Sequence, residues 1–223
     1  MTSHVNTFYL LDLDRTLFDT QGASDILIQL VDELSHELAQ HIRSQIDAFN
    51  QIGASFAIRD VIVEQVGEVK AKAIEHAFIT EGKRRSLLLE GAIELMADVG
   101  QPPARQFGIM TYGSVKGQTM KLIAAQLDNV PHSIIQQKRK GEVIATWQRD
   151  GGYQLPPELG GVFASELVFV DDRLFSFEGL PEDVTAYWVT QELALLDAVE
   201  HATNVHPVQS LTEVLEREHQ RRN

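Results

Sequence analysis

Two pairs of aspartates stand at the ends of short apolar runs in the sequence. The first pair is Asp12 and Asp14, two residues apart at the end of TFYLLDL, and the second is Asp171 and Asp172, directly after LVFV. Four carboxylates that meet at one place repel one another strongly unless a cation lies among them. Oxygen ligands without histidine or cysteine favour Mg²⁺, which binds through a few carboxylates and a substrate phosphate. The two pairs therefore indicate a magnesium site.

The alternative role of these acids is to cap a turn or a helix. An isolated pair such as Asp12 and Asp14 suits that role, because aspartate side chains accept hydrogen bonds from the first N–H groups of a helix. Two pairs, each after a buried apolar run, favour a site instead. Ligands of an open parallel sheet bind at the carboxyl ends of its strands.

Five short apolar segments are expected to form the strands that position these acids: Thr7–Leu13, Phe107–Thr111, Ser133–Gln136, Leu167–Val170 and Val184–Val189. Lys116–Leu127 has the spacing of an amphipathic helix between the second and third strands. Strands that alternate with helices are joined by right-handed crossovers into a parallel sheet that is covered on both faces. The expected fold class is therefore α/β.

A long helical segment separates the first strand from the second. Gly22–Val99 has apolar residues at helical spacing, so we expect about four helices, interrupted near Gly53 and Gly82. Its place in the chain indicates an insertion after the first strand. Further on, the turn-rich Gly151–Gly161 is expected to be a loop, and Leu211–Arg217 a last helix that frays in the polar sequence after it.

Composition narrows the class of protein. The chain has 223 residues, 32 acidic side chains against 19 lysines and arginines, and a formal net charge of −13. This excess of acid argues against nucleic-acid polymers and membranes as partners, since both bind basic surfaces. The absence of cysteine excludes disulfides, thiolate zinc sites and cysteine nucleophiles. No basic leader precedes the first apolar run, which carries aspartates, so neither a signal peptide nor a membrane span is expected, and the expected location is cytoplasmic.

Four segments together resemble the motifs of the haloacid dehalogenase-like (HAD) superfamily of phosphohydrolases. LLDLDRTLFDT resembles motif I, FGIMT with Thr111 motif II, KGEVI with Lys140 motif III and VFVDD motif IV, and they follow one another in the family's order. The resemblance implies a Rossmann-like parallel sheet of strand order 5-4-1-2-3, with helices on both faces and an α-helical cap inserted between motifs I and II. The implied boundaries are 1–20 and 100–223 for the catalytic core and 21–99 for the cap.

The resemblance also implies a role for each acid. Asp12 would be the nucleophile that forms an aspartyl-phosphate, and Asp14 the general acid and base for the leaving alkoxide and the attacking water. A second aspartate at this position distinguishes the phosphotransferases of the family from its true dehalogenases, which lack it. The implied cofactor is Mg²⁺, with ligands from Asp12, Asp14 (through its backbone carbonyl), Asp171 and Asp172.

Motifs II and III supply the phosphate contacts that the resemblance implies. Thr111 and the neighbouring Tyr112 would hold phosphoryl oxygens, and Lys140 would neutralise charge between nucleophile and phosphate. Lys138 is an alternative to Lys140, since both follow the third strand, but the Lys-Gly-Glu pattern favours Lys140. Arg15 departs from the small or neutral residue that is usual in motif I, and either contacts phosphate or points to solvent.

The sequence therefore predicts a Mg²⁺-dependent, capped phosphohydrolase that cleaves a small phosphorylated metabolite. A phosphomutase of the same superfamily is the alternative among enzymes, and a phosphate- or protein-binding member without turnover is the alternative outside them. The intact pair of Asp12 and Asp14 argues against the last, because a site that has lost its activity is expected to lose one of them.

Overall fold

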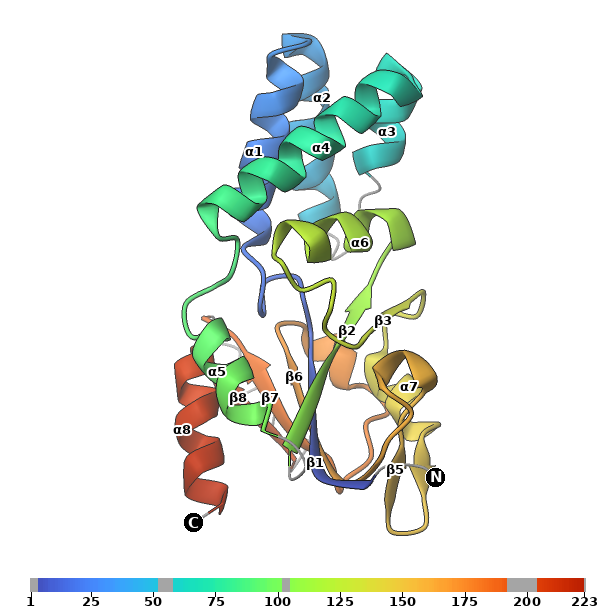
Figure 1. Ribbon diagram of the computed structural model, residues 1–223, viewed down its shortest axis with the longest axis vertical. Helices are drawn as coiled ribbons and strands as arrows, with labels where there is room; N and C mark the ends of the chain where they lie inside the picture. The colour runs from blue at the N-terminus through green and yellow to red at the C-terminus, as the bar shows by residue number, and fades with distance from the viewer. Residues whose placement is uncertain (1–3, 52–57, 102–104, 192–203, 223) are drawn as a thin grey trace. The chain divides into compact units, whose positions relative to one another are not determined.

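The computed structural model describes residues 4–51, 58–101, 105–191 and 204–222 of the chain (Figure 1). The chain divides into two compact units. The first unit contains residues 1–17, 88–111 and 130–223, and the second contains residues 18–87 and 112–129. The first is an α/β unit and the described part of the second is built of helices. The domain boundaries expected from the sequence, with the cap at 21–99, remain a prediction.

The helices of the second unit follow the apolar spacing seen in the sequence. They are α1 (Thr20–Asp32), α2 (His36–Gln51), α3 (Ile58–Val66), α4 (Glu68–Arg85) and α6 (Val115–Ala124). On α1, for example, Ile26, Leu27 and Val31 are buried while Asp25 and Gln29 are exposed. Burial of such apolar stripes against one another holds a helical unit together. Contacts of α1 with α2 and α4, and of α4 with α6, join these helices.

The helix interruption predicted near Gly82 follows the end of α4 at Arg85, so Gly82 itself lies inside the helix. A Cβ atom at this position would lie 2.9 Å from the Cβ of Ala124 and 2.9 Å from Cδ1 of Leu87. The glycine is therefore explained by the close approach of α4 to the end of α6. The helix continues to Arg85 because packing offsets the roughly 1 kcal/mol that glycine costs in a helix relative to alanine. The interruption predicted near Gly53 lies outside the described residues.

An eight-stranded sheet organises the described part of the first unit. Its strands are β1 (His4–Leu11), β2 (Arg105–Tyr112), β3 (His132–Ile135), β4 (Gln148–Arg149), β5 (Gly152–Gln154), β6 (Phe163–Asp171), β7 (Thr185–Val189) and β8 (Val205–Val208). β1 is parallel to β2 and β6, and β6, β7 and β8 are parallel to one another, whereas the hairpin β4-β5 is antiparallel to β6. The predicted α/β class, with a Rossmann-like and mostly parallel sheet, is confirmed.

The sheet contains strands that the predicted order 5-4-1-2-3 does not include. The five strands expected from the sequence lie in the order β7-β6-β1-β2-β3, but β8 extends the sheet beyond β7 and the hairpin β4-β5 also joins β6. β5 and the short 3₁₀ helix η1 (Pro157–Leu159) lie in the segment that was expected to be a loop. A Cβ atom on Gly152 would lie 2.1 Å from the carbonyl oxygen of Ala164. Glycine therefore permits the close approach of this hairpin to β6.

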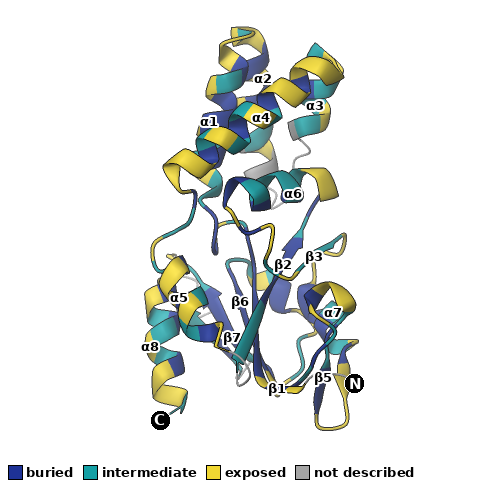
Figure 2. Ribbon diagram, viewed as in Figure 1, coloured by how far each residue is buried: buried dark blue, intermediate teal, exposed yellow. Residues whose placement is uncertain are grey.

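Successive residues of the central strand point to opposite faces of the sheet. Phe8 and Leu10 belong to a buried apolar cluster with Ile144 of α7 (Lys140–Ala145), whereas the Tyr9 hydroxyl donates to Glu218 of α8 (Leu211–Arg222). Figure 1 shows α8 and α5 (Ala92–Val99) on one side of the sheet and α7 on the other. Figure 2 shows that β1 and β6 are buried along most of their length. None of the described helices is long and apolar enough to cross a membrane.

The last helix is longer than expected. α8 runs to Arg222, whereas the sequence predicts fraying after Arg217. The carboxylate of Glu218 stabilises the added turn, because it is fully buried and accepts hydrogen bonds from the hydroxyls of Tyr9 and Tyr187. In the sequence this glutamate is one acid among several polar residues, so nothing in the pattern indicates that it is buried.

The carboxyl ends of β1, β2 and β6 lie level with one another. Leu11, the last residue of β1, pairs with Ile109 on β2 and with Val170 on β6. The backbone N–H of Asp12 donates to the carbonyl of Val170 over 2.9 Å. The acids that follow β1 and β6 therefore emerge at the same edge of the sheet.

Candidate active site

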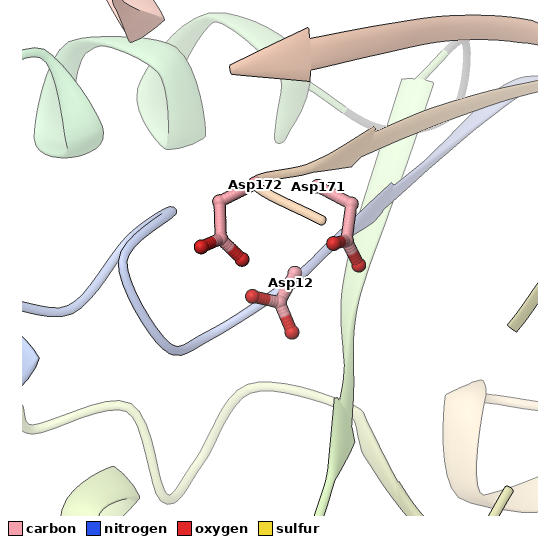
Figure 3. Close-up of side chains that lie close together, drawn as sticks. All are labelled: Asp12, Asp171 and Asp172. Carbon is pink, nitrogen blue, oxygen red and sulfur yellow. The ribbon is translucent and has the colours of Figure 1, made fainter. Parts of the chain in front are cut away.

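Asp12, Asp171 and Asp172 converge at the carboxyl edge of the sheet. Figure 3 shows their carboxylates close together, with Asp12 at the end of β1 and the other two at the end of β6. One carboxylate oxygen from each residue lies within 4.8 Å of the other two. Asp12 and Asp171 are buried and Asp172 is half-buried. The two acid pairs of the sequence thus contribute three carboxylates to one cluster.

Lys140 connects two of these carboxylates. Its Nζ donates to Oδ2 of Asp171 over 2.7 Å and also to Oδ1 of Asp12. The lysine is only 3% exposed, although it is the first residue of α7, because its side chain runs into the cluster. Lys138, the alternative, is exposed. The structure therefore brings Lys140 to the acids, in agreement with the Lys-Gly-Glu pattern.

Close packing at the start of α7 sets the position of Lys140. A Cβ atom on the next residue, Gly141, would lie between 2.6 and 3.0 Å from main-chain atoms of residues 177–180. These residues close the 3₁₀ helix η2 (Leu174–Phe177), which follows the second acid pair. The start of α7 therefore packs main chain against main chain on the segment that leaves the carboxylate cluster.

Asp14 lies in a turn that follows β1. The backbone N–H of Leu17 donates to the carbonyl of Leu13 over 3.0 Å, which closes the turn around Asp14, Arg15 and Thr16. Asp14 is half-buried, and Arg15 is exposed with a φ of 63°. Positive φ is uncommon for residues that have a side chain, which gives a structural reason for the small or neutral residue that is usual at this place in motif I.

Two buried threonine hydroxyls have no hydrogen-bond partner within the described residues. They belong to Thr16, in the turn after β1, and to Thr111, near the end of β2. An unpaired buried hydroxyl costs about 1–3 kcal/mol, so it requires an explanation such as a ligand or an ordered water. Tyr112, the other residue expected to hold phosphate, is the half-buried last residue of β2, and its role stays a prediction.

Burial and the charges of neighbouring carboxylates favour protonation of Asp12 and Asp172. Burial raises the pKa of Asp12 well above its ordinary value; Lys140 opposes this shift, while Asp171 and Asp172 add to it. Burial and the charge of Asp171 raise the pKa of Asp172 to about 7. For Lys140, burial alone would lower the pKa, but the charges of Asp12 and Asp171 outweigh it and raise the pKa. The lysine thus stays charged, and it is shared between two carboxylates.

The donor set fits a hard divalent cation. The clustered groups are carboxylates, the ligands that Mg²⁺ prefers, and they include neither histidine nor cysteine. A divalent cation would also reverse the local electrostatics and favour the ionised form of the acids. The residues that would hold the ion are Asp12, Asp171 and Asp172, with the backbone carbonyl of Asp14 as the further ligand implied by the motif.

Arg173 is a residue of the cluster that the sequence analysis did not identify. Its Nε lies 3.3 Å from Oδ2 of Asp172, and its backbone N–H donates to Oδ1 of Asp171 over 2.7 Å. The available signal was its place in the chain, because it directly follows the second acid pair as Arg15 follows the first. Thr16 was also missed, although it is the threonine of the D-x-D-x-T motif.

Comparison with solved structures identifies the fold. A putative haloacid dehalogenase-like hydrolase from Burkholderia xenovorans LB400 matches with a TM-score of 0.65 at 17% identity, over 97% of this chain and 98% of that one. A putative HAD-hydrolase from Bacillus subtilis, bound to magnesium, has a TM-score of 0.54 at 13% identity, over 96% and 98% of the two chains. L-2-haloacid dehalogenase from Xanthobacter autotrophicus has a TM-score of 0.51 at 14% identity, over 94% and 96%.

These matches cover nearly the whole of each chain at low sequence identity. No protein-family model matches the sequence, and neither does any curated protein. The chain therefore has the fold of the HAD-like hydrolases, which confirms at the level of the fold the resemblance carried by the four motifs.

Proposed function

We propose that this chain is a Mg²⁺-dependent phosphohydrolase that cleaves a small-molecule phosphomonoester through an aspartyl-phosphate on Asp12. The observation that carries the proposal is the setting of Asp12, a buried carboxylate that is ion-paired with Lys140 and clustered with further carboxylates. This setting suits a nucleophile whose target is an anion, because the lysine and a cation would neutralise charge around it. The expected substrate is a phosphorylated metabolite of the cytoplasm, and a net charge of −13 favours this over a nucleic-acid polymer.

In the first step, a carboxylate oxygen of Asp12 attacks phosphorus. A new O–P bond forms to Asp12 while the bond from phosphorus to the ester oxygen breaks. Asp14 transfers its proton to the departing alkoxide, so that the leaving group departs as an alcohol. The hydroxyl of Thr111 would donate to a phosphoryl oxygen, which would account for its lack of a partner within the described chain.

In the second step, water hydrolyses the aspartyl-phosphate. Asp14, now ionised, accepts a proton from the water as its oxygen attacks phosphorus, and the bond between phosphorus and Asp12 breaks. Inorganic phosphate leaves, Asp12 is a carboxylate again, and Asp14 is protonated for the next turnover. Throughout, Lys140 neutralises charge beside Asp12. Bound Mg²⁺ supplies further neutralisation of the phosphoryl charge.

Dehalogenation is the competing activity among proteins of this fold, as the dehalogenase from Xanthobacter autotrophicus illustrates. Asp14 favours phosphoryl transfer, because a departing alkoxide needs a proton whereas a departing halide does not. The carboxylate cluster favours the same choice, since displacement of a halide from carbon needs no divalent cation, whereas phosphoryl transfer commonly uses one.

The test measures phosphate release from 4-nitrophenyl phosphate and from butyl phosphate by metal-free protein, with and without added Mg²⁺. We expect turnover only with Mg²⁺. Asp12→Asn removes the attacking carboxylate, so turnover should fall to background, a loss of roughly 10⁴-fold or more. Asp150→Asn, in the exposed turn between β4 and β5, is the matched control and should retain wild-type activity.

Two results would contradict the proposal. Release of chloride from 2-chloropropionate, without release of phosphate from either ester, would identify a dehalogenase. Substantial Mg²⁺-dependent phosphate release by Asp12→Asn would show that the covalent mechanism is wrong. Mass measurement after acid quenching supplies an independent readout, because wild-type protein should carry one phosphoryl group and Asp12→Asn none.

A further inference from the structure

An arginine directly follows each of the two acid pairs. Arg15 comes after Asp14 and Arg173 comes after Asp172, in a chain with a net charge of −13. Because β1 and β6 end level with one another, both arginines lie at the edge of the sheet that holds the carboxylate cluster. The mechanism proposed above assigns no role to either of them.

Arg173 turns one edge of its guanidinium toward the cluster and leaves the other edge open. Its Nε lies 3.3 Å from Asp172, while its two Nη groups make no hydrogen bond or ion pair within the part of the chain that the structure describes, and the side chain is 33% exposed. Its backbone is held in place, because its N–H donates to Asp171 and its carbonyl accepts from Ser176 over 2.9 Å. A guanidinium with an open fork on an anchored backbone can bind a carboxylate or a phosphate through two parallel hydrogen bonds.

Arg15 holds the corresponding place after the first acid pair, in the turn that follows β1. It is exposed, and its φ of 63° places it in the left-handed region. That conformation costs a residue with a side chain about 1–2 kcal/mol, a cost that glycine would avoid. The backbones of Arg15 and Arg173 leave the sheet at the same edge, each directly after an acid pair.

The scissile phosphate already has its own partners. Lys140 contacts Asp12, the proposed nucleophile, so the ammonium, the Thr111 hydroxyl and a bound cation serve the phosphoryl group. Arg173 contacts Asp172 and not Asp12, so its charge lies beside the position of the phosphoryl group. Another part of a bound substrate would occupy that place.

We propose that Arg15 and Arg173 form a second anion-binding subsite, and that the substrate carries a carboxylate or a second phosphate close to the phosphate that is cleaved. This inference rests on the proposed phosphohydrolase function and specifies its substrate class. Both kinds of anion offer paired oxygens to the open edge of the guanidinium.

The test compares substrates that differ by one anionic group. We pair 2-carboxyethyl phosphate with propyl phosphate and 3-carboxypropyl phosphate with butyl phosphate, and propane-1,3-diol bisphosphate probes a second phosphate. The variants are Arg173→Gln and Arg15→Asn, since asparagine tolerates positive φ. Arg149→Gln is the matched control, because this exposed arginine of β4 donates to main-chain carbonyls.

Metal binding needs a separate measurement, because Arg173 contacts a proposed ligand of the ion. Calorimetric titration with Mg²⁺ gives the affinity of each variant without reference to turnover. All kinetic constants are then compared at saturating Mg²⁺, so that a change in metal affinity does not enter the comparison.

Wild-type protein should prefer an anionic substrate over its neutral partner by about tenfold or more in kcat/KM, the range expected for a charge-assisted hydrogen bond. Arg173→Gln should remove this preference, because it should raise KM for the anionic substrate much more than KM for the neutral one. Arg15→Asn should reduce the preference to a smaller extent, and Arg149→Gln should leave it intact. Comparison of kcat/KM for the carboxyalkyl phosphates with kcat/KM for the bisphosphate shows whether the subsite prefers a carboxylate or a phosphate.

Equal turnover of the charged and neutral substrates would overturn the subsite and leave the phosphohydrolase function standing. An equal loss on both classes in Arg173→Gln would also overturn it, because the arginine would then serve the scissile phosphate. Release of phosphate from none of these esters would overturn the phosphohydrolase function, and the subsite with it.

Discussion

Glu218 and Asp12 are both buried carboxylates of the first unit, but they differ in how completely their surroundings satisfy them. Glu218 lies on the buried face of α8 and accepts hydrogen bonds from the hydroxyls of Tyr9 (2.5 Å) and Tyr187 (2.8 Å) and from Nε of Arg221 (2.9 Å). Burial raises the pKa of both tyrosines, so their hydroxyls stay protonated and continue to donate. One carboxylate here has several donors.

Around Asp12, several carboxylates share one donor. Lys140 is shared between Asp12 and Asp171, Asp172 shares the edge, and the buried Thr111 hydroxyl has no partner among the described residues. Burying polar groups without partners costs free energy, so a cluster left incomplete favours a ligand that completes it. The contrast separates a carboxylate whose donors are complete from carboxylates whose donors within the described residues are not.

The largest expected effect is the loss of catalysis in the Asp14→Asn variant. Asp14→Asn keeps the nucleophile but removes the proton donor, so turnover of butyl phosphate should fall by about 10²–10⁴-fold. The loss in kcat/KM for 4-nitrophenyl phosphate should be much smaller, because its leaving group departs without a proton. The comparison uses kcat/KM, which reports the steps up to the aspartyl-phosphate, because the later attack of water needs Asp14 with either ester. Equal losses in kcat/KM would contradict the assignment of Asp14 as the acid.

Glu218→Ala should lower the stability of the protein and leave its activity unchanged. Removing this carboxylate leaves two buried hydroxyls without their partner and leaves Arg221 with Glu166 alone, so the free energy of unfolding should fall by about 3–5 kcal/mol. The kcat of the folded protein should stay at the wild-type value. Urea unfolding and activity at low temperature measure the two effects. Glu216→Ala, at an exposed position of the same helix, is the matched control; a similar loss there would show that the buried cluster is not the anchor.

Gly141→Ala tests whether the packing of α7 sets the position of Lys140. The added methyl group would lie between 2.6 and 3.0 Å from main-chain atoms of residues 177–180, so the start of α7 must shift and carry the lysine with it. A displacement of about 1 Å at a reacting group can cost roughly 10²-fold, so kcat should fall by this order while KM changes little.

Gly152→Ala controls for steric damage alone. Its added Cβ meets the carbonyl of Ala164, near the start of β6 and far along the strand from the acids. Stability should fall in both glycine variants, but kcat should fall only in Gly141→Ala. Equal kcat values in the two would refute the positioning role of Gly141.

The smallest expected effect is a pH dependence of Mg²⁺ binding. Asp172 must be ionised to bind the ion, and its pKa in the metal-free protein is about 7. Mg²⁺ affinity should therefore weaken by up to about tenfold per pH unit below 7 and level off above it, as measured by calorimetry. Affinity that is constant between pH 5 and 8 would argue against Asp172 as a ligand.

The raised pKa of Asp172 also makes the stability of the metal-free protein depend on pH. Its pKa is raised from 3.8 in the unfolded chain to about 7, so the folded state binds the proton more tightly. The contribution of Asp172 to stability is therefore fully present below about pH 4 and is lost as the pH rises through 7. Thermal unfolding with and without Mg²⁺ checks the sign, because the ion should stabilise the protein more at pH 8 than at pH 5.

Much of the architecture was predictable because it depends on local patterns. Apolar runs such as those in β1 and β6 are short and continuous, as expected for strands buried on both faces, and the acids follow them directly in the chain. Once the strands are known to be parallel, their carboxyl ends share an edge, so the convergence of Asp12 with Asp171 follows from the sequence. The helices of the second unit follow from apolar spacing in the same way.

Other features depend on neighbours that are distant in the chain. In the sequence, Gly82 predicts a break in a helix, but the close approach of α4 to α6 requires glycine there. Likewise, the pairing of β5 with β6 depends on the close approach of Gly152 to β6. Glu218 reads as a solvent-exposed acid, yet tyrosines from β1 and β7 surround it. Propensity and periodicity describe a residue by its sequence neighbours, so they do not register these contacts.

The sequence by itself determined which chemistry is present: two acid pairs at strand ends, a lysine within reach, and a helical segment after the first strand. Only the tertiary structure decided that Lys140 is buried between Asp12 and Asp171, and that Arg173 keeps one edge of its guanidinium open beside Asp172 within the described chain. The physical reason is that residue type and spacing fix which groups emerge at the edge of a sheet. Which of them meet, and which stay unpaired, depends on the packing of α7 and η2 against that edge.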